Sequence, residues 1–364
     1  GACLDGRAGN VRSSWNRLVM EMAWFIIVTV MLAMYVVLDG FDFGVGMIYP
    51  FVARTEADRR TALASIGPVW NANEVWLIAA GAVLFFAYPK AYAAGFSGFY
   101  LALILVLWLL IFRGLALELR AQVDHVLWKQ GWDTAFATSS VLLAIVFGTA
   151  LGNLIRGVPL NRDGYFFVPF WTDFRPGSEP GILDWFTVLL GLTCTVILAF
   201  HGANYLAMKT EGVLHQRAVS VAWILGWVSV GCTALTVIAV PMVQPSLSLS
   251  FSRNPAVYLA PLIGAIALGY SLYFRFRRRD TSAFLTGSVF IFLMLVSVMF
   301  GMYPYILVST TDQAFSLTVF NASTDSYGLT AGISWFVGGF LLILIYQIYL
   351  HSQFLGKTRS GDSH

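Results

Sequence analysis

Long apolar runs separated by short polar links dominate this chain. Nine runs reach the length of about 20 residues that a helix needs to cross the hydrocarbon core of a bilayer. The pattern predicts membrane spans at 22–41, 66–88, 91–112, 133–156, 184–208, 218–242, 256–274, 283–307 and 329–352. The sequence therefore predicts an all-α polytopic membrane protein with nine transmembrane helices.

The links group these spans into units. The fold expected is two four-helix bundles plus one extra helix. The predicted order is a polar, disordered N-terminal tail at 1–21, a first four-helix unit at 22–156, an outer aromatic loop at 157–183, a second four-helix unit at 184–307, an outer loop at 308–328, a ninth helix at 329–352 and a cytoplasmic tail at 353–364.

Basic residues are shared unequally between the two sets of links. Fourteen lysines and arginines follow odd-numbered spans, whereas five follow even-numbered spans. Because cytoplasmic loops carry the excess of Lys and Arg, the N-terminus is predicted outside and the C-terminus in the cytoplasm. Only 11% of the residues are charged. The basic residues cluster between apolar runs, so the net charge of +3 does not indicate nucleic-acid binding.

Two carboxylates near the end of the first span form the first candidate site. Asp39 and Asp42 stand three residues apart in the run YVVLDGFDFGVG. Carboxylates are costly at membrane depth, so the pair indicates ion or proton handling. The charge asymmetry places it at the cytoplasmic end of the span. The alternative is that both residues are interfacial anchors or helix caps.

The fifth span repeats this spacing with other side chains. It reads His201-Gly202-Ala203-Asn204, so His201 and Asn204 are interpreted as repeat counterparts of Asp39 and Asp42. Membrane proteins often carry their working site where such repeats meet. The alternative is that glycine-containing helix ends resemble one another by chance.

No metal site is predicted. Cys3, Cys194 and Cys232 form no CxxC or Cys/His pattern, which also argues against a disulfide framework or a covalently attached haem. A lone histidine in an apolar run, such as His201, is more typical of a hydrogen-bonding residue than of a metal ligand.

The second span holds the other polar group, in the run SIGPVWNANEVWLI. Helical spacing puts Trp70, Asn73 and Glu74 on one face, with Asn71 beside them. Glu74 then lies two turns into the membrane, so it is expected to be neutral, paired with arginine or surrounded by protein-lined water. Arg113, expected at the cytoplasmic end of the third span, is the predicted partner. A purely structural ion pair between helices is the alternative.

The link 113–132 follows the third span. It alternates charged residues, Glu118 among them, with leucine, valine and tryptophan. That pattern favours a segment lying along the cytoplasmic interface. Glu118 joins Arg113, Trp70 and Trp76 as residues expected to support the carboxylate site.

Three motifs carry a resemblance to a known family. The runs LDGFDFGVGMIYPF (38–51), TALASIGPVWNANEVWLIAAGAVLFFAYPKAYAAGFSGFY (61–100) and FGTALGNLIRGVP (147–159) resemble subunit II of the cytochrome bd-type quinol oxidases, which include the cyanide-insensitive oxidases. The resemblance extends in hydropathy from about Met22 to Leu350 and is densest in the first four spans.

This resemblance implies a bacterial inner-membrane heterodimer of the respiratory chain. Such a complex oxidises quinol and carries out the four-electron reduction of dioxygen to water. The b and d haems and the quinol-oxidising loop belong to subunit I, and subunit II supplies the dimer interface and a proton route without ligating haem. The resemblance leaves open a structural quinone or lipid in a groove of this subunit and a small accessory subunit beside it.

Residue roles follow only where the motifs match. Asp39 and Asp42 match the family's DGFD carboxylates, which are associated with proton uptake, and Trp70 and Trp76 match the tryptophans of its second span. The chain departs from the family at Asn71, where an acidic residue is usual, and an amide does not titrate at physiological pH.

The predicted proton pathway therefore runs from Asp39 and Asp42 past Asn71 to Glu74, and on to the haem site of subunit I. Arg113 is expected to tune Glu74 electrostatically. Two other function classes stay open on the residues alone. One is a secondary transporter, which would also carry buried carboxylates and repeats. The other is a scaffold subunit without a proton role.

Overall fold

The apolar runs fold into helices wherever the sequence predicts a span. The computed structural model describes residues 2–247, 255–354 and 356–358. Within these residues, nine helices are long and apolar enough to cross a membrane, which confirms the predicted fold class. They are α1 (Ala2–Val52), α3 (Trp70–Ala87), α5 (Tyr100–Leu119), α6 (Val126–Arg156), α7 (Trp185–Lys209), α8 (Gly212–Val243), α10 (Leu259–Phe276), α11 (Asp280–Met302) and α12 (Ser326–Gln353).

Shorter elements connect these helices. The antiparallel strands β1 and β2 pair with each other in the segment between α11 and α12. The connecting elements are α2 (Glu56–Ile66), α4 (Pro89–Gly98), the 3-10 helices η1 (Pro255–Tyr258) and η2 (Gln313–Phe315), β1 (Tyr305–Leu307) and β2 (Leu317–Thr318).

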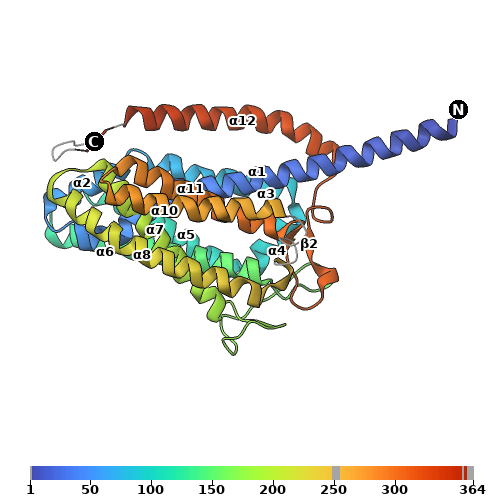
Figure 1. The fold of residues 1–364 in the computed structure, drawn as a ribbon, viewed down its shortest axis with the longest axis horizontal. Helices are drawn as coiled ribbons and strands as arrows, with labels where there is room; N and C mark the ends of the chain where they lie inside the picture. Colours follow the sequence, from blue (N-terminus) through green and yellow to red (C-terminus); the bar gives the residue numbers. More distant parts are fainter. Residues whose placement is uncertain (1, 248–254, 355, 359–364) are drawn as a thin grey trace.

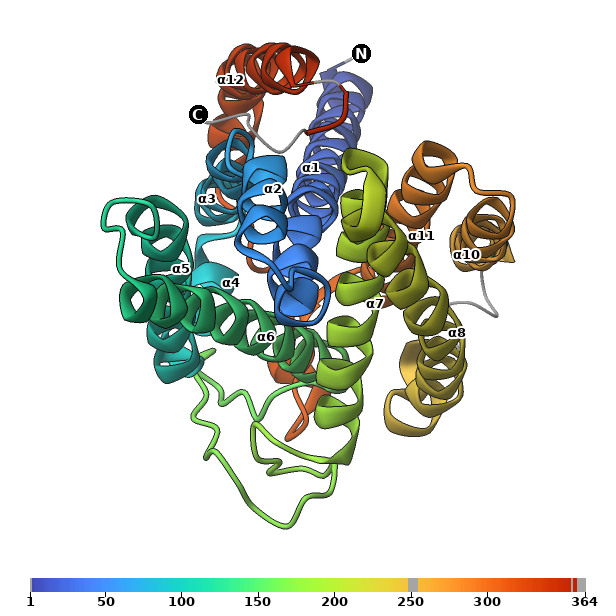
Figure 2. The same ribbon diagram turned by 90° about the vertical axis from the view of Figure 1, so that its left-hand side faces the viewer.

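The helices form two groups that meet where α1 and α6 pack against α7. Helices α1, α3, α5 and α6 pack together, α7, α8, α10 and α11 pack together, and α1 lies against α7 (Figure 2). Helix α12 lies outside both groups and runs beside α1 (Figure 1). The described termini lie toward opposite ends of the bundle, as an odd number of spans requires. Which end faces the cytoplasm stays a prediction of the charge count.

Helix α1 differs most from the prediction. It begins at Ala2, so residues 2–21, expected to be a disordered tail, are helical. It also continues beyond the expected end at residue 41 to Val52. Gly44 does not mark an exit. A Cβ there would lie 2.1 Å from the Leu198 carbonyl oxygen and 2.6 Å from the Gly202 Cα. The glycines allow α1 and α7 to cross closely.

Proline explains several other boundaries. Pro89 occupies the first turn of α4, directly after the end of α3, where its missing N–H costs nothing. The expected third span, 91–112, is divided at Phe99 into α4 and α5. Helix α11 ends at Met302, shortly before Pro304, so the expected span 283–307 is too long and Tyr305–Leu307 form a strand instead.

The outer aromatic loop packs partly against its own chain. Val158, Leu160 and Phe166 join a buried apolar cluster that also contains Leu307 and Val319 from the segment after α11. Other aromatic side chains of this loop stay exposed, with Phe167 at 80%. The two outer segments therefore close one end of the bundle together.

Candidate functional site

A buried ion pair joins α1 to α5. The Arg113 guanidinium donates from Nη1 to Asp39 Oδ2 at 3.0 Å and from Nη2 to Asp39 Oδ1 at 2.6 Å. This forked geometry fixes the two side chains relative to each other. The guanidinium carbon also lies 4.6 Å above the Phe43 ring, which favours a cation by its quadrupole. Both charged side chains are fully buried.

The second carboxylate is held by an amide instead. Asp42 Oδ2 accepts from Asn73 Nδ2 at 2.9 Å and lies 3.6 Å from Arg113 Nη2. Asn73 Oδ1 in turn accepts from Gln347 Nε2 at 3.0 Å. Four helices, α1, α3, α5 and α12, thus contribute side chains to one network, and the expected extra helix is part of the site.

The network contains more negative than positive charge. Two carboxylates face a single guanidinium, so one proton or cation is needed to make the group neutral. Asp42 Oδ1, Arg113 Nε and Gln347 Oε1 have no hydrogen-bond partner among the described residues. Buried polar atoms left in this way are usual positions for ordered water. The site can therefore hold water and exchange a proton.

The two carboxylates lie farther from the end of their helix than the sequence predicted. Asp42 precedes the end of α1 by ten residues, which places it about 15 Å from that end along the helix axis. Arg113 lies inside α5 rather than in the following link. The carboxylates are therefore not at the end of their helix, because α1 and α5 both extend past the predicted ends.

A second charged cluster lies between this site and the nearer end of the bundle. Asp133 on α6 accepts from Tyr49 at 2.6 Å, Arg120 at 2.5 Å and Arg59 at 3.1 Å. Glu56 on α2 accepts from Arg120 at 2.9 Å, and these hydrogen bonds from Arg120 lower the pKa of the Glu56 carboxyl to about 2. Unlike Asp39 and Asp42, Glu56 is partly exposed to solvent.

The predicted residues of α3 lie on different faces. Asn73 and Trp76 point inward and are buried, with the Trp76 ring 6.0 Å from that of Phe340. Asn71 is exposed and Glu74 is half-buried. Neither makes a side-chain hydrogen bond or ion pair within the described part of the chain. Glu74 is close enough to Arg113 to interact with it electrostatically.

The two remaining supporting residues behave differently from each other. Trp70 packs at the site, since its ring lies 3.2 Å from the position that a Cβ on Gly114 would take, next to Arg113. Glu118 is exposed near the end of α5, and its side chain makes no contact with the carboxylate network. Arg120, the residue directly after α5, makes the polar contacts there instead of Glu118.

The second helix group contains a related network. Asn204 Oδ1 accepts from Arg275 Nε at 3.0 Å, and Arg275 also pairs with Asp280 at 2.6 Å. His201, Asn204 and Arg275 each follow Asp39, Asp42 and Arg113 by 162 positions. The arginine match supports the interpretation of His201 and Asn204 as repeat counterparts. The second network has no carboxylate at the positions of Asp39 and Asp42.

His201 uses one ring nitrogen in a contact within the chain. His201 Nε2 donates to the Val37 carbonyl oxygen at 3.0 Å, and its ring is stacked 4.8 Å from that of Phe284. The other ring nitrogen, Nδ1, has no hydrogen-bond partner among the described residues. Across the described ranges, no group of three or more His, Cys, Asp and Glu side chains could hold a metal ion.

Sequence reasoning missed Gln347 and Arg275 as members of these networks, and it missed the contact of Asn73 with Asp42. Gln347 is a polar residue in an otherwise apolar helix, which is itself a signal at membrane depth. Arg275 belongs to a run of arginines whose pattern is typical of a basic link between spans, so the sequence did not identify it as buried. Its spacing from Arg113, equal to the repeat length, could have revealed it.

Comparisons with known proteins agree on one family. The sequence model for cytochrome bd terminal oxidase subunit II matches residues 20–354. The cytochrome bd-I ubiquinol oxidase subunit 2 of Escherichia coli K12 is 30% identical over 372 residues, covering 94% of this chain and 96% of the relative. The cytochrome bd ubiquinol oxidase subunit 2 of Bacillus subtilis is 33% identical over 309 residues, covering 84% and 87%.

A solved structure shares the fold. The bd oxidase of Geobacillus thermodenitrificans contains a chain that matches with a TM-score of 0.73 and 16% identity, covering 93% of this chain and 99% of that one. The chain therefore belongs to the family of cytochrome bd terminal oxidase subunit II, as a multi-pass protein of the bacterial inner membrane and part of a respiratory oxidoreductase complex with subunit I.

Proposed function

We propose that this chain supplies a proton route and the heterodimer interface to a quinol-oxidising, dioxygen-reducing complex. Quinol is the proposed electron donor because relatives from two organisms are named ubiquinol oxidases. The b and d haems are assigned to subunit I, as membership of the family implies. This chain is then not catalytic alone, and its contribution is to move protons toward the partner.

The observation that carries the proposal is the charge imbalance at Asp39, Asp42 and Arg113. Both oxygens of Asp39 accept hydrogen bonds from Arg113. Asp42 lies 3.6 Å from the same guanidinium, and its Oδ1 has no hydrogen-bond partner among the described residues. An uncompensated carboxylate in a membrane span is costly unless it binds a proton. Asp42 is therefore the proposed proton-carrying group, and Asp39 with Arg113 fixes its surroundings.

Protons would reach Asp42 from the charged cluster at the end of the bundle. Tyr49 belongs to that cluster through its bond to Asp133 and lies two turns after Asp42 on α1. Those seven residues correspond to about 10 Å along the helix. Ordered water would have to bridge this interval, in agreement with the unpartnered polar atoms at the site.

Helix α3 is the proposed exit toward subunit I. Asn73 contacts Asp42 on its inner face, while Asn71 and Glu74 are on its outer side without polar partners in the part of the chain described. A carboxylate and an amide facing lipid would both be costly. We therefore assign the outer side of α3 to the interface with subunit I, where the partner would cover Glu74 and receive its proton.

Two variants test this route in the assembled complex. Glu74→Gln and Asp42→Asn should each lower quinol-driven oxygen consumption by about 100-fold, the lower range for loss of a positioned acid–base group. The haem spectrum should stay unchanged, because neither residue contacts a haem ligand. Glu118→Gln is the matched control, since Glu118 is exposed and away from the network.

Normal oxygen consumption and normal proton uptake in both variants would refute the proton route and favour the scaffold alternative. Loss of assembly in Asp42→Asn alone would assign that residue a structural role, and Glu74→Gln would then decide the question. Membership of an oxidase family argues against the secondary transporter considered from the sequence.

A further inference from the structure

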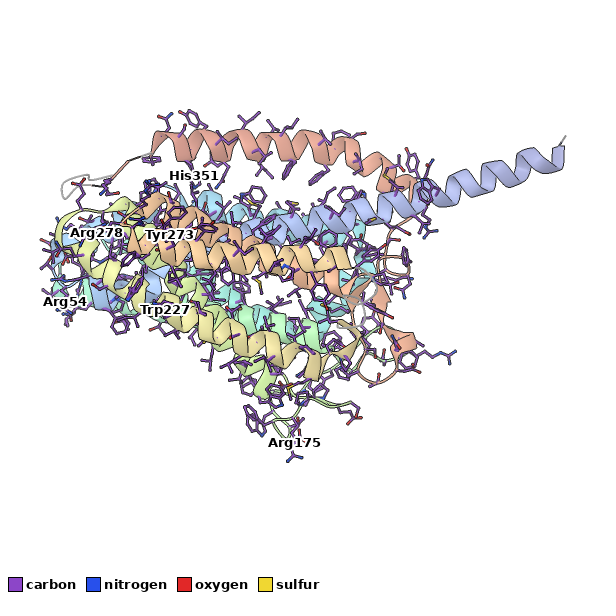
Figure 3. All side chains as sticks on the ribbon, viewed as in Figure 1. Arg54, Arg175, Trp227, Tyr273, Arg278 and His351 are labelled. Atoms are coloured by element: carbon purple, nitrogen blue, oxygen red, sulfur yellow. The ribbon has the colours of Figure 1, made fainter. Side chains whose placement is uncertain are left out.

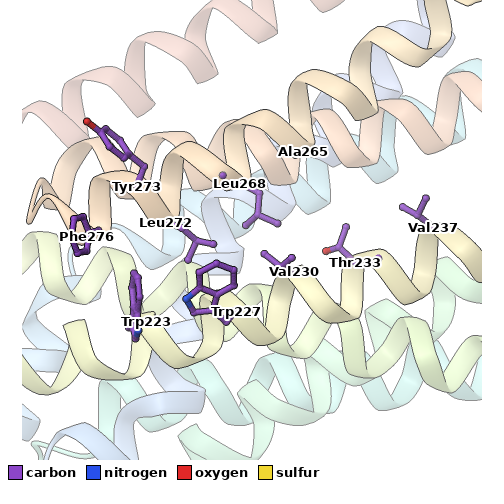
Figure 4. Close-up of a pocket in the computed structure, with 12 residues that line it drawn as sticks. Trp223, Trp227, Val230, Thr233, Val237, Ala265, Leu268, Leu272, Tyr273 and Phe276 are labelled. Atoms are coloured by element: carbon purple, nitrogen blue, oxygen red, sulfur yellow. The ribbon is translucent and has the colours of Figure 1, made fainter.

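A lipid-sized groove opens between α8 and α10, away from the proton route. Helix α8 packs on α7 and α10 packs on α11, but α8 and α10 approach each other only slightly. The resulting groove has a volume of about 650 Å³. Its floor is formed by Leu268 and Leu272, which are almost fully buried, and its walls by aromatic and aliphatic side chains (Figure 4).

The groove has two different ends. Trp223, Tyr273 and Phe276 lie at one end, and Val237 lies at the other (Figure 4). Trp223 and Val237 are separated by fourteen residues of α8, or about 21 Å. The aromatic end is suited to the headgroup region, where tryptophan and tyrosine gather. The aliphatic length between is suited to a hydrocarbon chain.

Three exposed arginines stand directly beyond the aromatic end. Arg277, Arg278 and Arg279 make no ion pair within the described residues. Arg277 is oriented toward the groove, since its Nε donates to the Tyr273 hydroxyl at 3.1 Å and its guanidinium lies 5.5 Å from that ring. Arg278 has a φ of 56°, a left-handed conformation that favours glycine.

Size and charge together select the occupant. The narrow apolar length between α8 and α10 fits an acyl chain, and the three arginines at its aromatic end favour an anionic group. A neutral quinone would leave the three arginines without a counter-charge. We propose that this groove binds one anionic phospholipid, with an acyl chain along α8 and α10 and its phosphate at Arg277–Arg279.

General physical principles support a bound anionic lipid in this groove. Basic pockets between transmembrane helices bind anionic headgroups, and a cleft between helices loses dispersion contacts unless it is filled. The positive-inside rule places Arg277–Arg279 at the cytoplasmic leaflet, where anionic lipids are abundant. The bound lipid would join α8 to α10, which make few direct contacts with each other. The inference is independent of the proposed proton route.

The chain offers matched controls for the test. Gly269 lines the groove and Gly231 lies elsewhere on α8, and a Cβ added at either position meets nothing within 4 Å. Gly269→Phe should therefore fill the groove, and Gly231→Phe should not. Arg278→Gln removes a headgroup contact, whereas Arg54→Gln removes an exposed cation at the same end of the bundle (Figure 3).

The experiment uses the purified two-subunit complex, delipidated in detergent and titrated with phosphatidylglycerol or phosphatidylcholine, with bound lipid counted by native mass spectrometry. One phosphatidylglycerol should bind tightly to the wild-type complex. Gly269→Phe should abolish this binding and Arg278→Gln should weaken it about fivefold, from the usual contribution of one arginine near a membrane surface. Both control variants should bind as the wild type does.

Several outcomes would overturn the proposal. Equal affinity for the two lipids would remove the role of the arginines. Retention of a quinone rather than a phospholipid in the groove would identify a different occupant. Loss of subunit I from the Gly269→Phe complex would show that subunit I, and not a lipid, occupies the groove. Tight lipid binding unaffected by Gly269→Phe would place the lipid elsewhere.

Discussion

Replacing Arg113 tests the central ion pair most directly. Arg113→Met removes the cation that forks onto Asp39 and lies 3.6 Å from Asp42, and all three side chains are fully buried. Leaving a buried charge unpaired lowers the free energy of unfolding by about 3–5 kcal/mol, because the remaining carboxylates keep their desolvation penalty without a partner. We expect this loss of stability in the assembled complex, measured as thermal denaturation followed by haem absorbance.

A double variant separates the pair from general packing. Replacing a buried ion pair by apolar groups of similar volume is often neutral, so Arg113→Met with Asp39→Leu should recover about 1.5–3 kcal/mol relative to the sum of the single changes. Arg54→Gln, at an exposed position, should stay within about 0.5 kcal/mol of the wild type. Strict additivity of the two single changes would refute the ion-pair reasoning.

The remaining predictions concern packing, pH and α12. Gly44→Ala should sharply reduce the yield of assembled complex, because its Cβ would lie 2.1 Å from the Leu198 carbonyl oxygen of α7, whereas Gly231→Ala, with nothing within 4 Å, should not. The pKa of Glu56 is lowered to about 2, so its stabilising effect is present above its ordinary value of 4.5 and is lost as the pH falls toward 2. Thermal midpoints across that interval should therefore fall less steeply in Glu56→Gln. Gln347→Leu breaks the bond to Asn73 and should raise amide exchange in α12, with exchange in α6 as the internal reference.

The positions of the spans could be predicted because each one satisfies a length requirement that a local apolar run reveals. Their ends could not. Gly44 and Gly46 look like a helix exit, yet each allows close packing, against Gly202 of α7 and Ser140 of α6 respectively. These contacts join residues far apart in the sequence. A local pattern does not distinguish a flexible end from a close helix crossing.

The candidate site shows the same limit. Helical spacing grouped Asn73 with Glu74 and named Arg113 as the partner of Glu74, but it did not tell which face of α3 points inward. Tertiary packing turns Asn73 toward Asp42 and leaves Asn71 exposed. Arg113 pairs with Asp39 rather than Glu74 because α5 continues past its expected end. The residue types were informative, and their pairing required the fold.

The internal repeat sharpens the role of the two carboxylates. Both halves carry a buried arginine at the equivalent place, Arg113 and Arg275, so the arginine belongs to the shared scaffold. Only the first half has acids at the equivalent helix positions. Arg275 finds its counter-charge in Asp280, whose side chain is 18% exposed, rather than in a carboxylate sealed beside it. A scaffold role alone would be served by either arrangement. The sealed pair Asp39 and Asp42, with one cation between them, is therefore the feature that points to proton transfer in the first half.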